Sequence, residues 1–166
     1  MWELPQKIIL AAGHAEGITP LNAFDNSLLD AGIADLNLIQ VSSILPPNVQ
    51  VVKLSKQYRS SPINLPAGML VPVVYTKIIS NHPGETIAAA VGAGIPTDKK
   101  KNGVIVEYKC VGKKREAEKM AEKMIKEMFS QRKLKLKQIK IVSSEHKVRK
   151  LGCAISAALL LKENAL

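Results

Sequence analysis

Residues 113–132 read KKREAEKMAEKMIKEMFSQR, and this stretch decides which class of fold the chain can adopt. Its apolar residues recur at spacings of three and four, while lysines and glutamates fill the opposite side. The apolar stripe consists of Ala117, Met120, Ala121, Met124, Ile125, Met128 and Phe129. A helix with one apolar side must bury it, so the pattern predicts an amphipathic surface helix packed against the rest of the protein.

The segments around this helix are mostly patterned as strands. Apolar runs of strand length occupy residues 7–12, 36–41, 69–80, 103–111 and 136–143. Residues 85–95 (ETIAAAVGAGI) and 151–161 (LGCAISAALLL) fit either a strand or a helix. Because strands outnumber helices, we expect an α+β fold: an αββα-type sandwich of mostly antiparallel strands with helices on the outer faces.

A second helix is predicted near the N-terminus, after a turn at residues 13–17. Thr19 can cap its first free N–H groups, Pro20 suits its first position, and Gly32 ends it. The predicted buried stripe consists of Leu21, Phe24, Leu28 and Leu29, with Asp25 in the second turn.

Length and composition favour one domain over residues 1–166, since 46% of the residues are hydrophobic and can form a single core. The chain has no apolar run of about eighteen residues and no signal peptide at its start, so we expect no membrane insertion and a cytoplasmic location. Cys110 and Cys153 stand apart and are expected to be free thiols. The three histidines share no metal-ligand spacing, so no metal site is predicted.

The net charge of +10 is concentrated in residues 99–150, where 18 Lys and Arg face 6 Glu, a net of +12. The remaining residues carry a net charge of −2. A small basic nucleic-acid-binding protein is therefore an alternative of a different class. Such proteins need interleaved aromatic residues or a recognisable motif, and only 4% of this chain is aromatic, so no nucleic-acid partner is expected.

Several local features are predicted to be irregular. Residues 53–66 (KLSKQYRSSPINLP) are polar and aperiodic, which predicts a mobile surface loop, and residues 81–84 form a turn by composition. Pro72 predicts an edge strand or a bulge. The glycines of residues 92–94 lack the rest of a dinucleotide fingerprint, so no dinucleotide is expected there.

Residues 37–47 (NLIQVSSILPP) run from an apolar strand through Ser42 and Ser43 into two prolines. The chain has two other Ser-Ser pairs: residues 60–61 lie in the predicted loop, and residues 143–144 are predicted to start a polar turn. Only Ser42 and Ser43 follow a strand predicted to be buried and precede residues that fix the backbone. On this evidence alone an ordinary strand end is the simpler interpretation.

The wider sequence changes that balance. The stretch at 37–47 is preceded by EGITPLNAFDNSLLDAGI and followed in order by PAGMLVPVVY, PGETIAAAV, GVIVEY, KKREAEKM and KLGCAISAAL. This series resembles the archaeal type of pyruvoyl-dependent arginine decarboxylase over nearly the whole chain. The main departure from the family is the loop at 53–66, which is longer and more basic.

The resemblance implies that the protein cuts itself between Ser42 and Ser43. The Ser43 hydroxyl attacks the Ser42 carbonyl to give an ester, elimination breaks the chain, and hydrolysis with loss of ammonia leaves a pyruvoyl group at position 43. The products would be a small β chain, 1–42, and a large α chain, 43–166. A fragment of about 40 residues hardly folds alone, so both parts must fold before cleavage.

The implied reaction converts L-arginine to agmatine and carbon dioxide for polyamine biosynthesis, through a Schiff base on the pyruvoyl group and without metal or pyridoxal phosphate. Glu107, in GVIVEY, is the candidate proton donor, because a partly desolvated carboxyl has a raised pKa and can be protonated near neutral pH. Without the resemblance, a glutamate facing water or pairing with a lysine would be the preferred interpretation. Another amino acid or S-adenosylmethionine is the alternative substrate.

Two further residues correspond to family positions. Asn37 matches an asparagine that assists cleavage, although an Asn at a strand start also satisfies backbone groups. Asp25 matches the ligand of the substrate guanidinium, although it could equally be a solvent-facing helix acid. In the family the site lies between copies, which implies a homo-oligomer, a trimer of cleaved protomers or a dimer of trimers.

Overall fold

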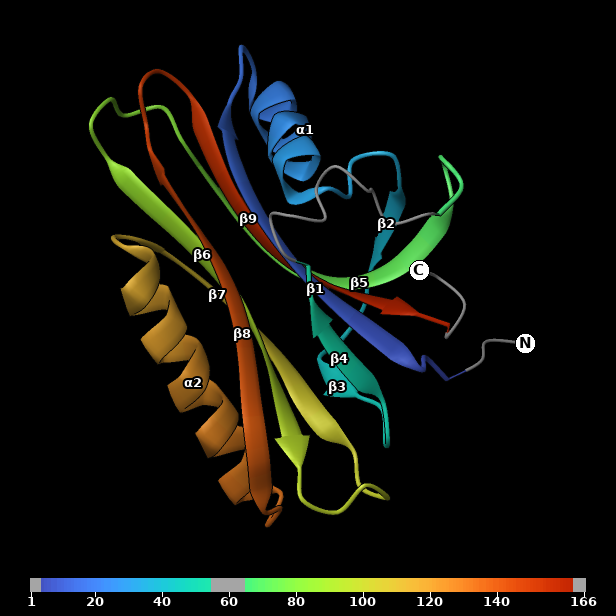
Figure 1. Cartoon of the computed structure of the whole chain (residues 1–166). Coiled ribbons are helices and arrows are strands. Elements are labelled where there is room, and N and C mark those ends of the chain that lie inside the picture. Colours follow the sequence, from blue (N-terminus) through green and yellow to red (C-terminus); the bar gives the residue numbers. More distant parts are fainter. Residues whose placement is uncertain (1–3, 55–64, 163–166) are drawn as a thin grey trace.

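The computed structural model describes residues 4–54 and 65–162 and has four layers, with one helix on each side of two stacked sheets (Figure 1). The predicted αββα sandwich of mostly antiparallel strands is confirmed. Most of the predicted loop at 53–66, including residues 60–61, lies outside the described residues.

The first sheet has five strands, and it carries the segment that leads to the Ser-Ser bond. Its order is β2 (Asn37–Gln40), β5 (Leu70–Ser80), β9 (Gly152–Leu161), β1 (Lys7–Glu16) and β4 (Gln50–Lys53). The central strands β5, β9 and β1 are antiparallel, whereas β2 and β4 run parallel to their neighbours at the two edges. β2 is therefore an edge strand.

The second sheet has four strands and is antiparallel throughout. Its order is β3 (Ile44–Leu45), β7 (Gly103–Val111), β6 (Thr86–Pro96) and β8 (Leu136–Lys147). The two segments that fitted either a strand or a helix are thus strands, β6 and β9. The core between the sheets includes Ile8, Leu10, Leu45, Val51, Val74, Val91, Ala93, Ile105 and Ala158.

Helix α2 (Lys114–Gln131) covers the outer face of the four-stranded sheet with the predicted apolar stripe, except that Met120 is exposed. It packs closely, because a Cβ built on Gly94 would lie 2.5 Å from Ile125 Cγ2 and 2.6 Å from a Phe129 ring carbon. The glycines at 92 and 94 therefore make room for α2, which gives them a packing role in place of a dinucleotide fingerprint.

Helix α1 (Pro20–Ala31) covers the five-stranded sheet and has the predicted ends, with the Thr19 hydroxyl capping Asn22 N and Gly32 in the left-handed conformation. Its predicted buried stripe is partly wrong, since Leu21 is 73% exposed and Leu29 58% exposed. The buried residues of α1 are Ala23, Ser27, Leu28 and Ala31.

Close contact with β1 explains these small residues. A Cβ on Gly13 would lie 2.4 Å from Ser27 O and 2.5 Å from Ala31 N, so the helix backbone approaches this strand directly. The predicted turn at residues 13–17 is wrong, because most of these residues belong to a strand. Gly13 belongs to β1, which continues to Glu16.

The structure also tests three smaller predictions. Residues 81–84 form the predicted turn, with Gly84 at φ 87°. Ser143 and Ser144 lie inside β8, so the predicted turn there is wrong; the Ser144 hydroxyl donates to Ile155 O at 2.8 Å. β5 is not an edge strand, but Pro72 precedes the residues paired with β9, which begin at Val73.

Candidate active site

The Ser42–Ser43 bond lies where the chain passes from one sheet to the other. Just before it, Val41 N donates to Val73 O of the five-stranded sheet at 2.9 Å. Just after it, Ser43 O accepts a hydrogen bond of 2.9 Å from Ile105 N of the four-stranded sheet. The two sides of the bond are thus held by different sheets, which limits how far the backbone between them can relax.

The approach to this bond differs from the sequence prediction, and its exit agrees with it. β2 is partly exposed, not buried, because it forms the edge of its sheet. After the bond, Leu45 and Pro46 are buried. Asn48 follows Pro47 with φ 55°, the pattern of a tight turn with proline at its second position. The exit is therefore fixed in direction.

Glu107 is the ionisable side chain that meets Ser43. It extends from β7, and the Ser43 hydroxyl donates to Glu107 Oε2 at 3.4 Å. Glu107 is opposite buried Val91 in β6 and is itself only partly buried. Burial raises the pKa of Glu107, and the hydrogen bond from Ser43 offsets part of this rise. A carboxyl that titrates closer to neutrality can deliver a proton at position 43.

Asn37 and Asp25 are not brought to this point by the chain itself. Asn37 is at the start of β2, on the opposite end of the strand from Ser42, and its Nδ2 donates to Gly68 O at 2.8 Å. Asp25 is exposed on α1, which lies on the outer face of the five-stranded sheet. Within one copy, Ser43 contacts Glu107, and neither Asn37 nor Asp25 reaches these two residues.

One polar cluster was missed by the sequence analysis. Glu16 accepts hydrogen bonds from His146 Nε2 at 2.6 Å and from three backbone N–H groups, those of Arg149, Lys150 and Leu151. Burial acts to raise the pKa of Glu16, but these hydrogen bonds outweigh it and lower the pKa to about 2. Because the cluster joins residues far apart in sequence, no local spacing could have indicated it.

The same cluster extends to a second histidine. His146 Nδ1 and His14 Nδ1 are 3.0 Å apart, so one ring donates to the other. Since the Glu16 carboxylate accepts from Nε2, a neutral His146 presents Nδ1 as the acceptor of that contact. This arrangement fastens the turn between β8 and β9 to the end of β1.

Two further findings concern metals and membranes. Among residues 4–54 and 65–162, no three His, Cys, Asp or Glu side chains are grouped so that they can hold a metal ion. In the same part of the chain, no helix has both the length and the apolar character needed to cross a membrane. Cys110 and Cys153 are free thiols, as predicted.

Comparison with known proteins places this arrangement in a family. The model of the family described as pyruvoyl-dependent arginine decarboxylase matches residues 7–165. The chain is 48% identical over 159 residues to the pyruvoyl-dependent arginine decarboxylase of Methanocaldococcus jannaschii, covering 96% of this chain and 92% of that protein. It is 45% identical over 160 residues to the enzyme of the same name from Pyrococcus furiosus, covering 96% and 97%. The chain therefore belongs to the pyruvoyl-dependent arginine decarboxylase family.

Proposed function

We propose that this protein is a self-processing decarboxylase that converts L-arginine to agmatine and carbon dioxide. The observation that carries the proposal is the contact between the Ser43 hydroxyl and the Glu107 carboxyl, at a Ser-Ser bond fixed on both sides by different sheets. Family membership supports arginine as the substrate, since relatives covering nearly the whole chain carry that name.

The first step is cleavage of the chain between Ser42 and Ser43. The Ser43 oxygen attacks the Ser42 carbonyl carbon and the amide C–N bond breaks, which leaves an ester and a free amine on residue 43. Elimination then removes the Ser43 α-proton and breaks the Cβ–O bond, so that Ser42 leaves as a carboxylate and residue 43 becomes dehydroalanine. Water converts the dehydroalanine to the pyruvoyl group and releases ammonia. Glu107 accepts the hydrogen bond of the Ser43 hydroxyl and so fixes the direction in which its oxygen points. Cleavage gives the β chain, 1–42, and the α chain, 43–166.

The two products remain one folded domain. The small chain contains β1, α1 and β2, and β1 pairs with both β9 and β4 of the large chain. α1 lies against the five-stranded sheet, with core contacts to Ile155 and Leu159. The hydrogen bonds and the core therefore hold the two chains together after the peptide bond is broken.

Position 43 suits a pyruvoyl group. When formed from Ser43, this group supplies a ketone that condenses with the substrate amine and withdraws electrons as carbon dioxide leaves. The Ile105 N–H already binds the carbonyl oxygen of residue 43 and is placed to stabilise negative charge on that oxygen. No metal or pyridoxal phosphate is part of the proposal.

Glu107 then acts as the proton donor to the substrate α-carbon. Conversion of Ser43 removes the hydroxyl whose hydrogen bond lowers the Glu107 pKa, whereas burial, which raises that pKa, stays. Cleavage itself thus makes the carboxyl more readily protonated. The same residue orients the hydroxyl before cleavage and supplies a proton after it.

Asp25 is proposed to bind the substrate guanidinium from a neighbouring copy. Its own α1 is exposed and apolar around it, with Leu21 73% exposed and Leu29 58% exposed, as expected of a surface that another copy covers. We therefore propose a homo-oligomer, a trimer of cleaved protomers or a dimer of such trimers. Each site would combine Ser43 and Glu107 of one copy with Asp25 of the next.

Asn37 is proposed to assist cleavage indirectly. Its hydrogen bond to Gly68 O ties the start of β2 to the segment before β5, and β2 leads directly to Ser42. A cytoplasmic location is proposed together with a role in polyamine biosynthesis, because arginine is available there.

Intact-mass analysis with a denaturing gel tests the proposal. The wild-type chain is expected to give two fragments, the larger blocked to Edman degradation, and to release carbon dioxide from arginine in preference to histidine. Ser43→Ala is expected to stay whole at 18.0 kDa and to be inactive. Ser42→Ala, which keeps the attacked carbonyl, is the matched control and should still cleave. A wild-type chain that stays uncut after incubation contradicts the proposal.

A further inference from the structure

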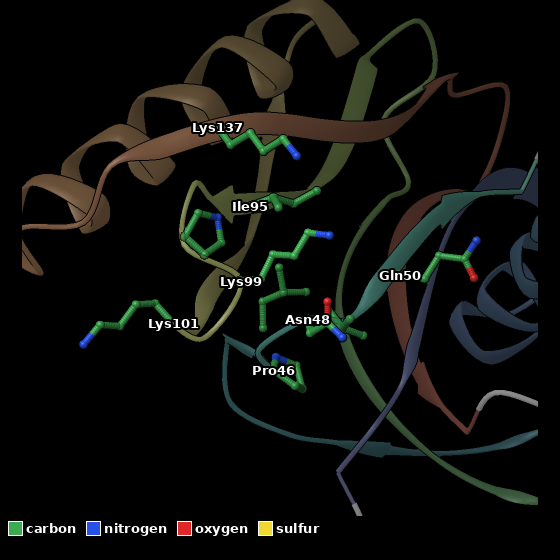
Figure 2. Close-up of a pocket in the computed structure, with 10 residues that line it drawn as sticks. Pro46, Asn48, Gln50, Ile95, Lys99, Lys101 and Lys137 are labelled. Carbon is green, nitrogen blue, oxygen red and sulfur yellow. The ribbon is translucent and has the colours of Figure 1, made fainter.

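A pocket with a volume of about 250 Å³ lies near the exit from the Ser-Ser bond (Figure 2). It is bounded by the turn between β3 and β4, by the end of β6 with the following turn, and by the start of β8. Its apolar part includes buried Leu45 and Pro46 together with Ile95. The pocket therefore exists only when these three segments, which are separate in the sequence, are folded together.

The charged groups of this pocket all have the same sign. Lys99, Lys101 and Lys137 line it, and none of its lining residues is acidic. In the described part of the chain, none of these three ammonium groups has a carboxylate within ion-pair distance. In Figure 2, Lys99 and Lys137 extend toward the side on which Gln50 lies, whereas Lys101 points the opposite way.

Two amide side chains complete the polar lining. Asn48 lies in the turn between β3 and β4, and its positive φ of 55° holds this turn in one conformation, whereas Gln50 is the first residue of β4. Amide N–H groups and lysine ammonium groups are donors that bind oxyanions. A cation such as agmatine is repelled by the same lysines.

We propose that this pocket binds a small, multiply charged oxyanion, a phosphate or a polycarboxylate, held chiefly by Lys99 and Lys137. The volume suits a molecule of the size of pyrophosphate or citrate. Leu45 contributes both to the pocket and to β3, two residues after Ser43, so the ligand contacts the segment that leaves the Ser-Ser bond. This site is separate from the arginine site and does not rest on the proposed decarboxylation.

Calorimetric titration of the purified full chain with inorganic pyrophosphate, and separately with citrate, tests the site. Ionic strength is matched with chloride, because a chain with net charge +10 attracts anions everywhere on its surface. We expect saturable binding of one anion per chain. Tighter binding of pyrophosphate assigns a phosphate ligand, and tighter binding of citrate assigns a polycarboxylate.

Charge-removing variants locate the binding. Lys99→Gln and Lys137→Gln each remove one ammonium group and are expected to weaken binding about tenfold, and the double variant about a hundredfold. Lys100→Gln is the matched control, because Lys100 stands in the same turn but does not line the pocket. It should change the affinity less than about twofold.

Three results would overturn the inference. The first is no saturable binding of either anion, and the second is an equal loss of affinity in Lys100→Gln. The third is a change in oligomer size of the Lys99→Gln, Lys137→Gln double variant without any anion, measured by sedimentation, since the lysines would then contact another copy. All three lysines are exposed, so folding is expected to survive, and circular dichroism verifies it.

Discussion

Ser43 and Glu107 are in direct contact, since the Ser43 hydroxyl donates to Glu107 Oε2 at 3.4 Å. The strand that carries Glu107 binds residue 43 a second time, because the Ser43 carbonyl accepts from Ile105 N, two residues earlier. β7 therefore holds both the side chain and the backbone of residue 43. Because the proton carrier and the backbone anchor belong to one strand and are two residues apart, their relative positions are fixed.

Glu107→Gln is expected to separate the two activities of this site. Glutamine keeps an oxygen that accepts the Ser43 hydrogen bond, so the chain should still cleave, but it has no carboxyl proton to deliver. We expect decarboxylation to fall by about 10² to 10⁴, the usual contribution of a positioned acid. Steady-state carbon dioxide release with cleaved protein measures this. Glu122→Gln, on the exposed side of α2, is the control; normal turnover by Glu107→Gln would remove the proton-donor role.

The raised pKa of Glu107 predicts how stability depends on pH. A carboxyl whose pKa is higher in the folded than in the unfolded chain favours folding below the unfolded value, near 4.5, and this contribution is lost as pH rises through the folded value. Above that value, Glu107→Gln avoids the cost of burying a charge. We expect the double variant Ser43→Ala, Glu107→Gln, which stays uncut, to unfold at a higher temperature than uncut Ser43→Ala at pH 8, with the difference shrinking at pH 4. If the two variants differed by the same number of degrees at pH 8 and at pH 4, burial of the Glu107 charge would not be the cause of the difference.

Glu16 predicts the opposite dependence. Its pKa is lowered to about 2 by hydrogen bonds to the turn after β8 and to His146, so it stabilises the fold above about pH 4.5 and loses this effect as pH falls toward 2. Glu16→Gln should cost about 1 to 2 kcal/mol near pH 7, allowing for solvent screening, and much less near pH 2.5. Thermal unfolding at the two pH values checks this. If Glu16→Gln lost the same stability at both pH values, the shape of the side chain and not its charge would be responsible.

The sequence predicts the layers well but not their closest contacts. The stripe of α2 and the caps of α1 are local patterns, and the structure confirms them except at Met120, which is exposed. Which side of α1 is buried could not be read from hydrophobicity, because the helix approaches β1 through Gly13 and small residues. The prediction that β2 is buried was wrong, because whether a strand lies at the edge of a sheet depends on partners distant in sequence.

In the candidate site, too, local sequence patterns were predictable and contacts between distant segments were not. Glu107 was chosen because the strand motif GVIVEY resembles the family, and the structure places it beside Ser43. The anchoring by Val73 and Ile105 uses backbone groups, which no side-chain pattern indicates. The roles given to Asn37 and Asp25 stay predictions, since a single copy does not bring either of them to residue 43.

Asp25→Ala is expected to impair substrate binding while leaving chain cleavage intact. Loss of a charge-assisted contact to the guanidinium is worth about 2 kcal/mol, so KM for arginine should rise about thirtyfold. Kinetics with arginine on fully cleaved protein measures the change. Asp35→Ala removes another exposed carboxylate between α1 and β2 and is the control. If both variants raise KM equally, general charge and not a specific contact explains the effect.

Mixing two impaired variants, assayed at an arginine concentration far below the KM of Asp25→Ala, tests whether one site uses two copies. In Asp25→Ala subunits Glu107 is intact, and in Glu107→Gln subunits Asp25 is intact. If Asp25 of one copy serves Glu107 of the next, equal random mixing gives about one site in four with both native groups, because each group is native with a probability of about one half. Co-expression, or unfolding and refolding together, should therefore recover up to about a quarter of wild-type activity. Each variant refolded alone is the control. If each site used a single copy, every mixed subunit would lack one group, and mixing would recover nothing.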